Sequence, residues 1–254
     1  MKKLPILALL MFLALFSCKK KKNDVIDTPT PIPVVQQSKL SLKPTFGSQN
    51  LVLDSVYTMS NGYEIEFVEV KAYFTGIQSG GSVLKDAALF NFRETGTLIF
   101  QANQVVSNPT SIQFGIGVPS SINHNDPSTF PNTNPLNIAI ANDMHWDWNP
   151  GYIFFKVEAK VDTIVDGVTN CNHYLVYHVG TDSYLTDKTI TNLSWSPASA
   201  TMNQAWLKLD LKNFFENSGN SIDVKTEFTT HSMSSQSVLT EKARQNFAAS
   251  ISAQ

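Results

Sequence analysis

The chain has 254 residues, of which 42% are hydrophobic, and it carries a formal net charge of -2 with a pI near 6.2. This length and hydrophobic content suffice for one sizeable core. Proteins that bind nucleic acids usually present a strongly basic surface, and this balance of charges offers none. The composition therefore argues against nucleic acid as a partner.

The first residues predict an export signal. Lys2 and Lys3 precede an uncharged apolar run that ends at Ser17 and Cys18. The run is shorter than the roughly 20 apolar residues that a permanent transmembrane helix needs. Such a start, with small residues before a cysteine, is typical of a lipoprotein signal peptide, although a plain secretory signal with an incidental cysteine is the alternative. We expect a signal peptide at residues 1–17 and a lipid on Cys18, which would anchor the protein to a bacterial membrane in the periplasm or at the outer membrane.

A tether is expected to follow the lipid. Residues 18–38 contain four consecutive lysines and the prolines Pro29, Pro31 and Pro33, with few apolar side chains to bury. Such a composition favours an extended, flexible spacer. One domain is then expected over residues 39–254. If Cys18 carries lipid, Cys171 is the single thiol of the mature chain and has no partner for an intrachain disulfide.

Apolar and polar residues alternate along most of this domain, as they do in half-buried strands. Asn61-Gly62 stands between two such runs and predicts a tight hairpin, because both residues tolerate positive φ. Many short strands favour an all-β fold, and we predict an antiparallel β-sandwich with long loops. The expected strands are Lys39–Phe46, Val56–Thr58, Glu64–Phe67, Val68–Ile77, Thr97–Phe100, Ile112–Val118, Ile153–Val161, His173–Val179 and Leu207–Leu211.

Two segments depart from this alternation. Residues 119–150 are rich in Asn, Asp and Pro and are too long for an ordinary connection, so we expect a working or well-packed loop. Near the C-terminus, apolar side chains recur every four residues, which predicts an amphipathic helix. Its apolar positions are Leu239, Ala243, Phe247 and Ile251.

The motifs of common enzymes are missing from the sequence. It contains no nucleophile motif, no phosphate-binding glycine loop, no His-Glu-x-x-His segment and no Cys-x-x-Cys pair, so we expect a protein that is not an enzyme. Imidazole and thioether groups instead suggest a metal site, and together they suit copper better than magnesium or calcium. Single histidines also occur in loops or in hydrogen-bonded core positions, and this alternative stays open. The histidines are His124, His145, His173, His178 and His231, with Met144 and Met233 close in sequence to two of them.

Several segments carry a family resemblance. The most specific are Ile122-Asn123-His124 and the run from Met144 to Tyr152, with its Trp-x-Trp-x-x-Gly-Tyr pattern. Supporting matches are Gly115 to Pro119, Lys71 to Thr75, Tyr177 to Gly180, and His231-Ser232-Met233. With these segments the chain resembles the MbnP-like family, the periplasmic copper-associated proteins linked to methanobactin, over roughly residues 39–251.

The resemblance implies a β-sandwich and, as in the characterised branch, copper held by histidines beside a tryptophan that a partner dihaem enzyme oxidises to kynurenine. On this basis His178 and His231 are the expected imidazole ligands, with Met233 and His145 as further candidates. Trp146 or Trp148 is the candidate for oxidation, and Tyr152 and His124 are expected to line the site. The copper-binding members place a histidine two residues after the tryptophan, whereas this chain has Trp148 or Pro150 there.

Each of these residues also has a structural interpretation. Trp146 and Trp148 share a face if extended and could pack in the core. His178 could be a hydrogen-bonded histidine at a strand end, and His124 could tie down the long loop. His173 points to the opposite side of its strand from His178 and is left out of the site.

A second class of function is a surface lipoprotein that binds a glycan or peptide and no metal. In that case Tyr152, Trp195 and Trp206 would provide stacking platforms.

Overall fold

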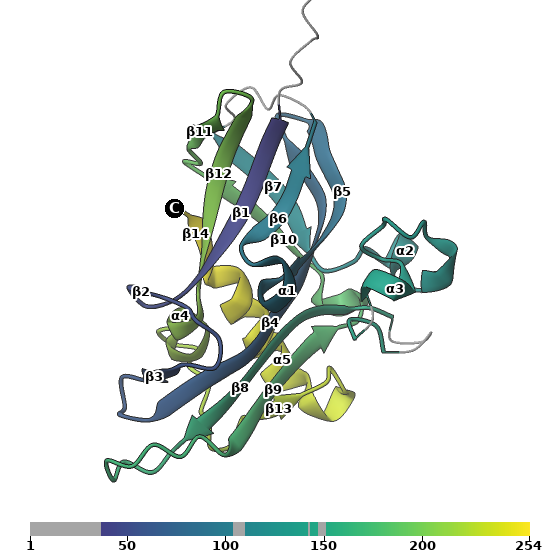
Figure 1. Ribbon diagram of the computed structural model, residues 1–254. Coiled ribbons are helices and arrows are strands. Elements are labelled where there is room, and N and C mark those ends of the chain that lie inside the picture. The colour runs from purple at the N-terminus through teal and green to yellow at the C-terminus, as the bar shows by residue number, and fades with distance from the viewer. Residues whose placement is uncertain (1–36, 104–109, 142, 147–150) are drawn as a thin grey trace, which may run out of the picture. The chain divides into compact units, whose positions relative to one another are not determined.

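A computed structural model of the protein describes residues 37–103, 110–141, 143–146 and 151–254 (Figure 1). The expected signal peptide, the expected lipidation site Cys18, nearly all of the expected tether, and Trp148 lie outside these residues. The chain divides into the units Met1–Pro33 and Val34–Gln254, and every described element belongs to the second. No helix within the described ranges is long and apolar enough to cross a membrane.

The first sheet is built around the N-terminal strand of the domain. β1 (Gln37–Phe46) lies between β12 (Met202–Asp210) and β2 (Gln49–Asn50), and β12 also pairs with β11 (Trp195–Ser199). β6 (Leu98–Ala102) extends the sheet beside β1, and β14 (Ile251–Ala253) extends it beside β12. The two ends of the domain therefore meet in one sheet.

The second sheet has a very long strand, β4 (Glu64–Ser79), at its centre. Its strand order is β10 (Thr186–Thr191), β7 (Ser111–Ile116), β4, β8 (Ile153–Asp162), β9 (His173–Gly180) and β13 (Thr229–Thr230). β3 (Val56–Thr58) and β5 (Ser82–Asn91) also pair with β4. Bulges between Phe67 and Glu69 and beyond Thr75 interrupt its pairing, which lets one strand serve different neighbours along its length.

One apolar core lies between the two sheets. Leu40 and Leu42 from the first sheet and Phe67 from the second are all fully buried in it. The helices α4 (Leu211–Glu216) and α5 (Ser237–Ala249) contribute aromatic side chains, and the Phe247 ring stacks on Phe155 at a centroid distance of 4.1 Å. Burial of this apolar surface is the main source of stability, at about 25 cal/mol per Å² removed from water.

A second, smaller apolar cluster covers part of the outer face of the second sheet. Tyr73 and Phe154 point outward from β4 and β8 and are buried by side chains of the described residues between Val118 and Tyr152, such as Leu136. This segment contains α2 (Ser120–Asn123), the 3-10 turn η1 (Pro127–Thr129) and α3 (Ile138–Ala141). Gly151, with φ of +76°, approaches Asn123 so closely that a Cβ would lie 2.5 Å from the Asn123 carbonyl oxygen. The described part of the long connection is therefore well packed, as one of the two expectations had it.

The predominantly β fold with a C-terminal helix is confirmed, and the two sheets form a curled half-barrel. The predicted hairpin at Asn61-Gly62 is also confirmed by the antiparallel pairing of β3 with β4. Each sheet is mixed, however, because β1 runs parallel to β12 and β13 runs parallel to β9. Alternation of side chains is the same in both orientations, so it could not give the direction of pairing.

The predicted helix ends earlier than its apolar spacing indicated. Ile251 belongs to β14, where it pairs with Leu209 across the sheet. The edge of β12 offers backbone hydrogen bonds that a further helical turn would leave unused. Other elements were not predicted, among them β5, β10, β11, β13, α1 (Phe92–Thr95), α2, α3, α4, and the turns η2 (Asp182–Tyr184) and η3 (Ser234–Gln236).

Candidate metal site

Parallel pairing of β13 with β9 brings two of the predicted ligands together. Thr230 is in register with Tyr177, so the next residues along the two strands, His231 and His178, lie side by side. Their ring centroids are 4.9 Å apart and the ring planes are nearly perpendicular, at 84°. This is well within the roughly 8 Å that two imidazoles sharing one ion can span, with metal–nitrogen bonds near 2 Å. The two histidines are more than 50 residues apart in sequence, and their proximity comes from sheet pairing alone.

A carboxylate fixes one of the two imidazoles. Nε2 of His178 lies 2.6 Å from Oε1 of Glu158 on β8, and the His178 side chain is only 13% exposed. The hydrogen bond from His178 lowers the pKa of Glu158, against the opposing effect of burial. With Nε2 directed at a carboxylate, Nδ1 is the nitrogen left to bind a ligand. Strand register puts the two side chains on one face, because Glu158 is in register with Val176, two residues before His178.

His231 belongs to a short segment that hydrogen bonds attach to the end of β9. Gly180 donates its backbone N–H to Oγ of Ser232 at 3.0 Å, and that hydroxyl donates to the carbonyl of His178 at 3.3 Å. Ser232 has a φ of +60°, which turns the chain directly after His231. Burial lowers the pKa of His231 below its ordinary value, and the neighbouring His178 lowers it further. The neutral imidazole, which is the form that binds a metal, is thereby favoured.

The indole of Trp146 lies on the same face of the sheet. A Cβ built on Gly180 would lie 2.7 Å from Cζ3 of Trp146, so the ring sits directly over this glycine. Gly180 follows His178 by two residues along β9, and such residues share a face about 7 Å apart. Trp146 itself is held by a backbone hydrogen bond to the carbonyl of Gly151 at 3.1 Å. The pair of imidazoles and one of the two candidate tryptophans are therefore neighbours.

A family model described as MbnP matches residues 35–236. The chain belongs to the MbnP family. A solved structure of MbnP from Methylosinus trichosporium is similar at 16% sequence identity, over 74% of this chain and 78% of that chain, with a TM-score of 0.47. A comparison with curated proteins gives no match. MbnP proteins are extracytoplasmic and are linked to methanobactin systems.

The other residues predicted for the MbnP site, and the neighbouring Met144, have different surroundings. His145, itself part of the well-packed segment, packs edge-on against Tyr152 with ring centroids 4.8 Å apart. Met233 is half exposed, at 53%, two residues beyond His231. Met144 is fully buried in the smaller apolar cluster, where it packs as a core side chain. Trp148 lies outside the described residues.

His124 serves to tie the long segment, as its structural interpretation predicted. Its Nε2 lies 3.0 Å from Oδ2 of Asp182 in η2. The neighbouring Asn123 donates to the other oxygen of Asp182 at 2.8 Å and accepts the backbone N–H of Tyr152 at 2.9 Å. This network joins α2 to η2 and to Tyr152, the residue directly before β8.

Tyr152 cannot be a stacking platform for a glycan, so that prediction is wrong. Its side chain is fully buried in the smaller cluster, and its hydroxyl donates to the carbonyl of Leu136. An aromatic residue that follows a proline- and asparagine-rich loop can equally be the anchor of that loop, and the sequence did not separate the two cases. Trp195 and Trp206 are half-buried.

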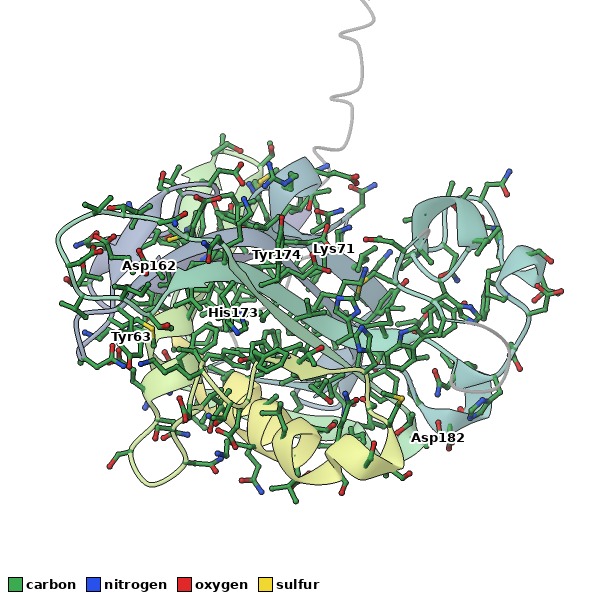
Figure 2. The ribbon with its side chains drawn as sticks, turned by 90° about the horizontal axis from the view of Figure 1, so that it is seen from below. Tyr63, Lys71, Asp162, His173, Tyr174 and Asp182 are labelled. Carbon is green, nitrogen blue, oxygen red and sulfur yellow. The ribbon has the colours of Figure 1, made fainter. Side chains whose placement is uncertain are left out.

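Two nearly buried lysines lie beside the site and were not predicted. Lys71 on β4 and Lys156 on β8 are both 6% exposed, and both ammonium groups contact Oδ2 of Asp143, at 2.8 and 3.0 Å. Burial by itself lowers the pKa of Lys71, but the hydrogen bonds with Asp143 and Glu69 outweigh it and raise the pKa. Asp143 thus attaches the start of the Trp146 segment to the sheet. In Figure 2, Lys71 is labelled among the side chains of this face.

The donor set restricts the metal that could bind. Within the described part of the chain, no three His, Cys, Asp or Glu side chains are grouped closely enough to hold an ion. Two imidazoles are too few for a tetrahedral zinc site, which takes four protein ligands in structural sites. Two imidazoles instead fit a softer ion that needs few ligands and also accepts a thioether. Copper in its reduced state, Cu(I), is such an ion.

Proposed function

We propose that this protein is an extracytoplasmic lipoprotein, lipidated on Cys18, that binds copper through His178 and His231. The observation that carries the proposal is the pair of imidazoles 4.9 Å apart, with Glu158 at 2.6 Å from His178. A carboxylate that accepts the second nitrogen of a histidine is the usual companion of a metal-bound imidazole, because it fixes the tautomer and makes the other nitrogen a stronger ligand. Membership of the MbnP family supports the same conclusion.

Trp146 is the tryptophan that we assign to this site. Its ring lies over Gly180, on the face that carries His178. In the characterised branch that the chain resembles, a partner dihaem enzyme oxidises such a tryptophan to kynurenine. The amine and carbonyl groups of kynurenine would add possible metal ligands next to the histidines. Met233 and His145 are the further candidates for ligation. The proposed role is copper handling with this partner, as a binding protein that has no catalytic activity of its own.

The absence of a histidine two residues after the tryptophan does not remove the pair of imidazoles. His231 reaches His178 from β13, a separate strand, and needs no contribution from the tryptophan segment. A site with two imidazoles from adjacent strands is therefore compatible with the sequence of the Trp146 segment.

The test is retention of copper by the purified protein and three single variants. The protein is equilibrated with Cu(I) or with Zn(II), freed of unbound metal by gel filtration, and analysed for bound metal. We expect about one copper per chain, and loss of that copper in both His178→Ala and His231→Ala. His173→Ala is the matched control, because His173 lies on the same strand with its ring against Phe228, 4.9 Å away, on the opposite face. Equal copper in all four proteins, or none in the unaltered one, would disprove the proposal.

A further inference from the structure

We propose that the protein has a second binding site, for a neutral, hydroxyl-rich ligand such as a sugar ring, in a cleft across β4, β7 and β10. The cleft has a volume of about 410 Å³, within the lower part of the range of small-molecule sites. It is independent of the copper site, because β10 and β13 are opposite ends of the strand order of this sheet.

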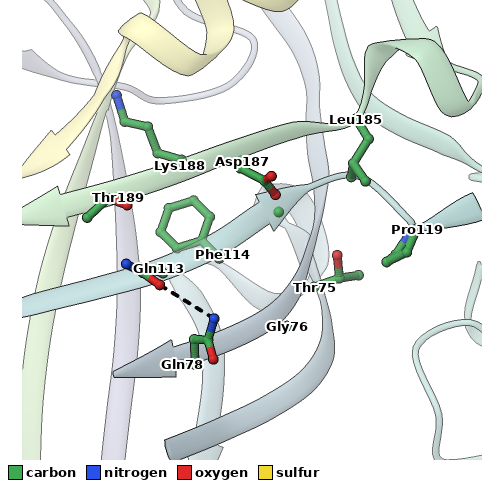
Figure 3. Close-up of a pocket in the computed structure, with 11 residues that line it drawn as sticks. Thr75, Gly76, Gln78, Gln113, Phe114, Pro119, Leu185, Asp187, Lys188 and Thr189 are labelled. Atoms are coloured by element: carbon green, nitrogen blue, oxygen red, sulfur yellow. Dashed lines mark hydrogen bonds between the residues drawn. The ribbon is translucent and has the colours of Figure 1, made fainter. Parts of the chain in front are cut away.

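Strand register aligns polar side chains in two rows across the cleft. Thr75 on β4 pairs with Gly115 on β7, which pairs in turn with Asp187 on β10. In the next row, Gln78 pairs with Gln113, and Gln113 pairs with Thr189. Residues two apart on a strand share a face, so both rows present their side chains on the same side of the sheet. Figure 3 shows Gln78, Gln113 and Asp187 around the same opening.

Gly115 forms the floor of the cleft, between Thr75 on β4 and Asp187 on β10. A Cβ on Gly115 would lie 3.1 Å from Oγ1 of Thr75 and 3.4 Å from Cδ1 of Leu185, so any larger side chain here would fill the cleft. Pro119 and Leu185 provide apolar surface at one end. The pairing of β4 with β7 shifts between Thr75 and Gln78, and Gly76 with its φ of +57° allows this irregularity.

The polar groups suit hydroxyls better than a charged ligand. The two amides contact each other, with Nε2 of Gln78 at 3.5 Å from Oε1 of Gln113, which is a weak interaction that a ligand can replace. An amide offers both donors and acceptors, and the Asp187 carboxylate can accept two hydroxyl donors at once. The hydroxyl of Thr75 donates to the carbonyl of Gly117 at 2.8 Å and so presents only its lone pairs.

An anion is disfavoured by the Asp187 carboxylate on the β10 side of the cleft. Lys188 lies on the alternate side of β10 and extends away from Asp187 in Figure 3, so it does not reverse this preference. A sugar ring matches the remaining features, because its hydroxyls meet the amides and the carboxylate while its C–H face meets Leu185 and Pro119. The ligand class is therefore a neutral saccharide residue.

The test uses NMR titration of the isotope-labelled protein with methyl glycosides of glucose, galactose and mannose and with N-acetylglucosamine, and with glycerol as a simple polyol. We expect saturable shifts at Thr75, Gly115 and Asp187 for at least one sugar and none for glycerol. Loss of the charge-assisted bonds in Asp187→Asn should weaken binding by about tenfold or more, and Gln113→Ala should weaken it as well.

Two controls separate this site from its surroundings. Asp86→Asn removes an exposed carboxylate on β5 outside the cleft and should leave sugar binding unchanged. His178→Ala should also bind sugar normally, whatever its copper content. No saturable shift with any of the four sugars, shifts at other residues, or an unchanged affinity in Asp187→Asn would overturn the proposal.

Discussion

Nε2 of His178 and Oε1 of Glu158 are 2.6 Å apart, across two adjacent antiparallel strands of the second sheet. Replacing the carboxylate by an amide in Glu158→Gln keeps the shape of the side chain but removes its charge. We expect copper affinity to fall by about 10- to 100-fold, because the partner that orients the imidazole is weakened. Competition with a chelator of known copper affinity measures this change.

The matched control is Glu66→Gln. Glu66 lies on the same outer face but pairs with Lys160 at 3.0 Å instead of a histidine. Loss of the Glu66 charge should leave copper affinity unchanged. An equal decrease in both variants would show that Glu158 acts only through the general charge of this face.

The lowered pKa of His231 makes the stability of the metal-free protein depend on pH. Burial and the neighbouring His178 keep its pKa below the ordinary value of 6.5. As the pH falls through that ordinary value, the unfolded chain takes up a proton more readily than the folded one, so the free energy of unfolding decreases. The decrease should level off once the pH is below the lower, folded pKa. Urea unfolding of metal-free protein between about pH 7.5 and 5 measures it, and His231→Gln should flatten the curve over this window.

The sequence predicted the two histidines but not the carboxylate that accompanies them. His178 and His231 came from ligand chemistry and family resemblance. Glu158 could not be distinguished from the other charged residues of a strand that alternates apolar and polar side chains, because its partner is defined only by the register of β8 against β9. The same limit applies to Lys71 and Lys156, which look solvent-exposed in sequence and are buried by the segment that carries Asp143.

Of the fold, the strands with clear alternation were predictable, and the parallel pairing at β1 and β13 was not. Parallel neighbours come from distant parts of the chain, and no turn signal connects them. The strand β5 was missed because its alanines and polar residues give weak alternation, and it is held by its pairing with β4.

Asp143 is expected to hold the Trp146 segment on the sheet. In Asp143→Ala, Lys71 and Lys156 lose a shared partner, and hydrogen bonds to charged groups contribute about 1.5 to 3 kcal/mol. The loss in unfolding free energy should be near the lower end, because Lys71 keeps Glu69 at 2.6 Å and the Asp143 side chain is 42% exposed. Chemical denaturation measures the change, with Asp86→Ala as an exposed control. A change no larger than that of the control would contradict the role of Asp143 as an attachment point.

Cys18→Ser tests the proposed lipid anchor. The variant is expected to carry no lipid and to leave the membrane fraction or to accumulate as a precursor. The described domain begins at Gln37, beyond the altered residue, so its melting temperature should be unchanged. Labelling of cells with radioactive fatty acid measures the modification, and label on the Cys18→Ser protein would contradict the prediction.

Gly180→Ala tests whether the position of Trp146 matters to the site. The added Cβ would lie 2.6 Å from the carbonyl oxygen of Tyr152 and 2.7 Å from Cζ3 of Trp146, so both must shift. Overpacking of this kind costs about 1 to 3 kcal/mol of stability. We also expect reduced copper retention, because the indole is displaced from the face that His178 shares. A double-mutant cycle with Trp146→Ala separates the clash with the indole from the clash with the carbonyl of Tyr152. In the Trp146→Ala background, Gly180→Ala should cost less stability, because the clash with the indole is gone. If the cost of Gly180→Ala is the same in both backgrounds and copper is retained, then the indole is a bystander and the site consists of the histidines alone.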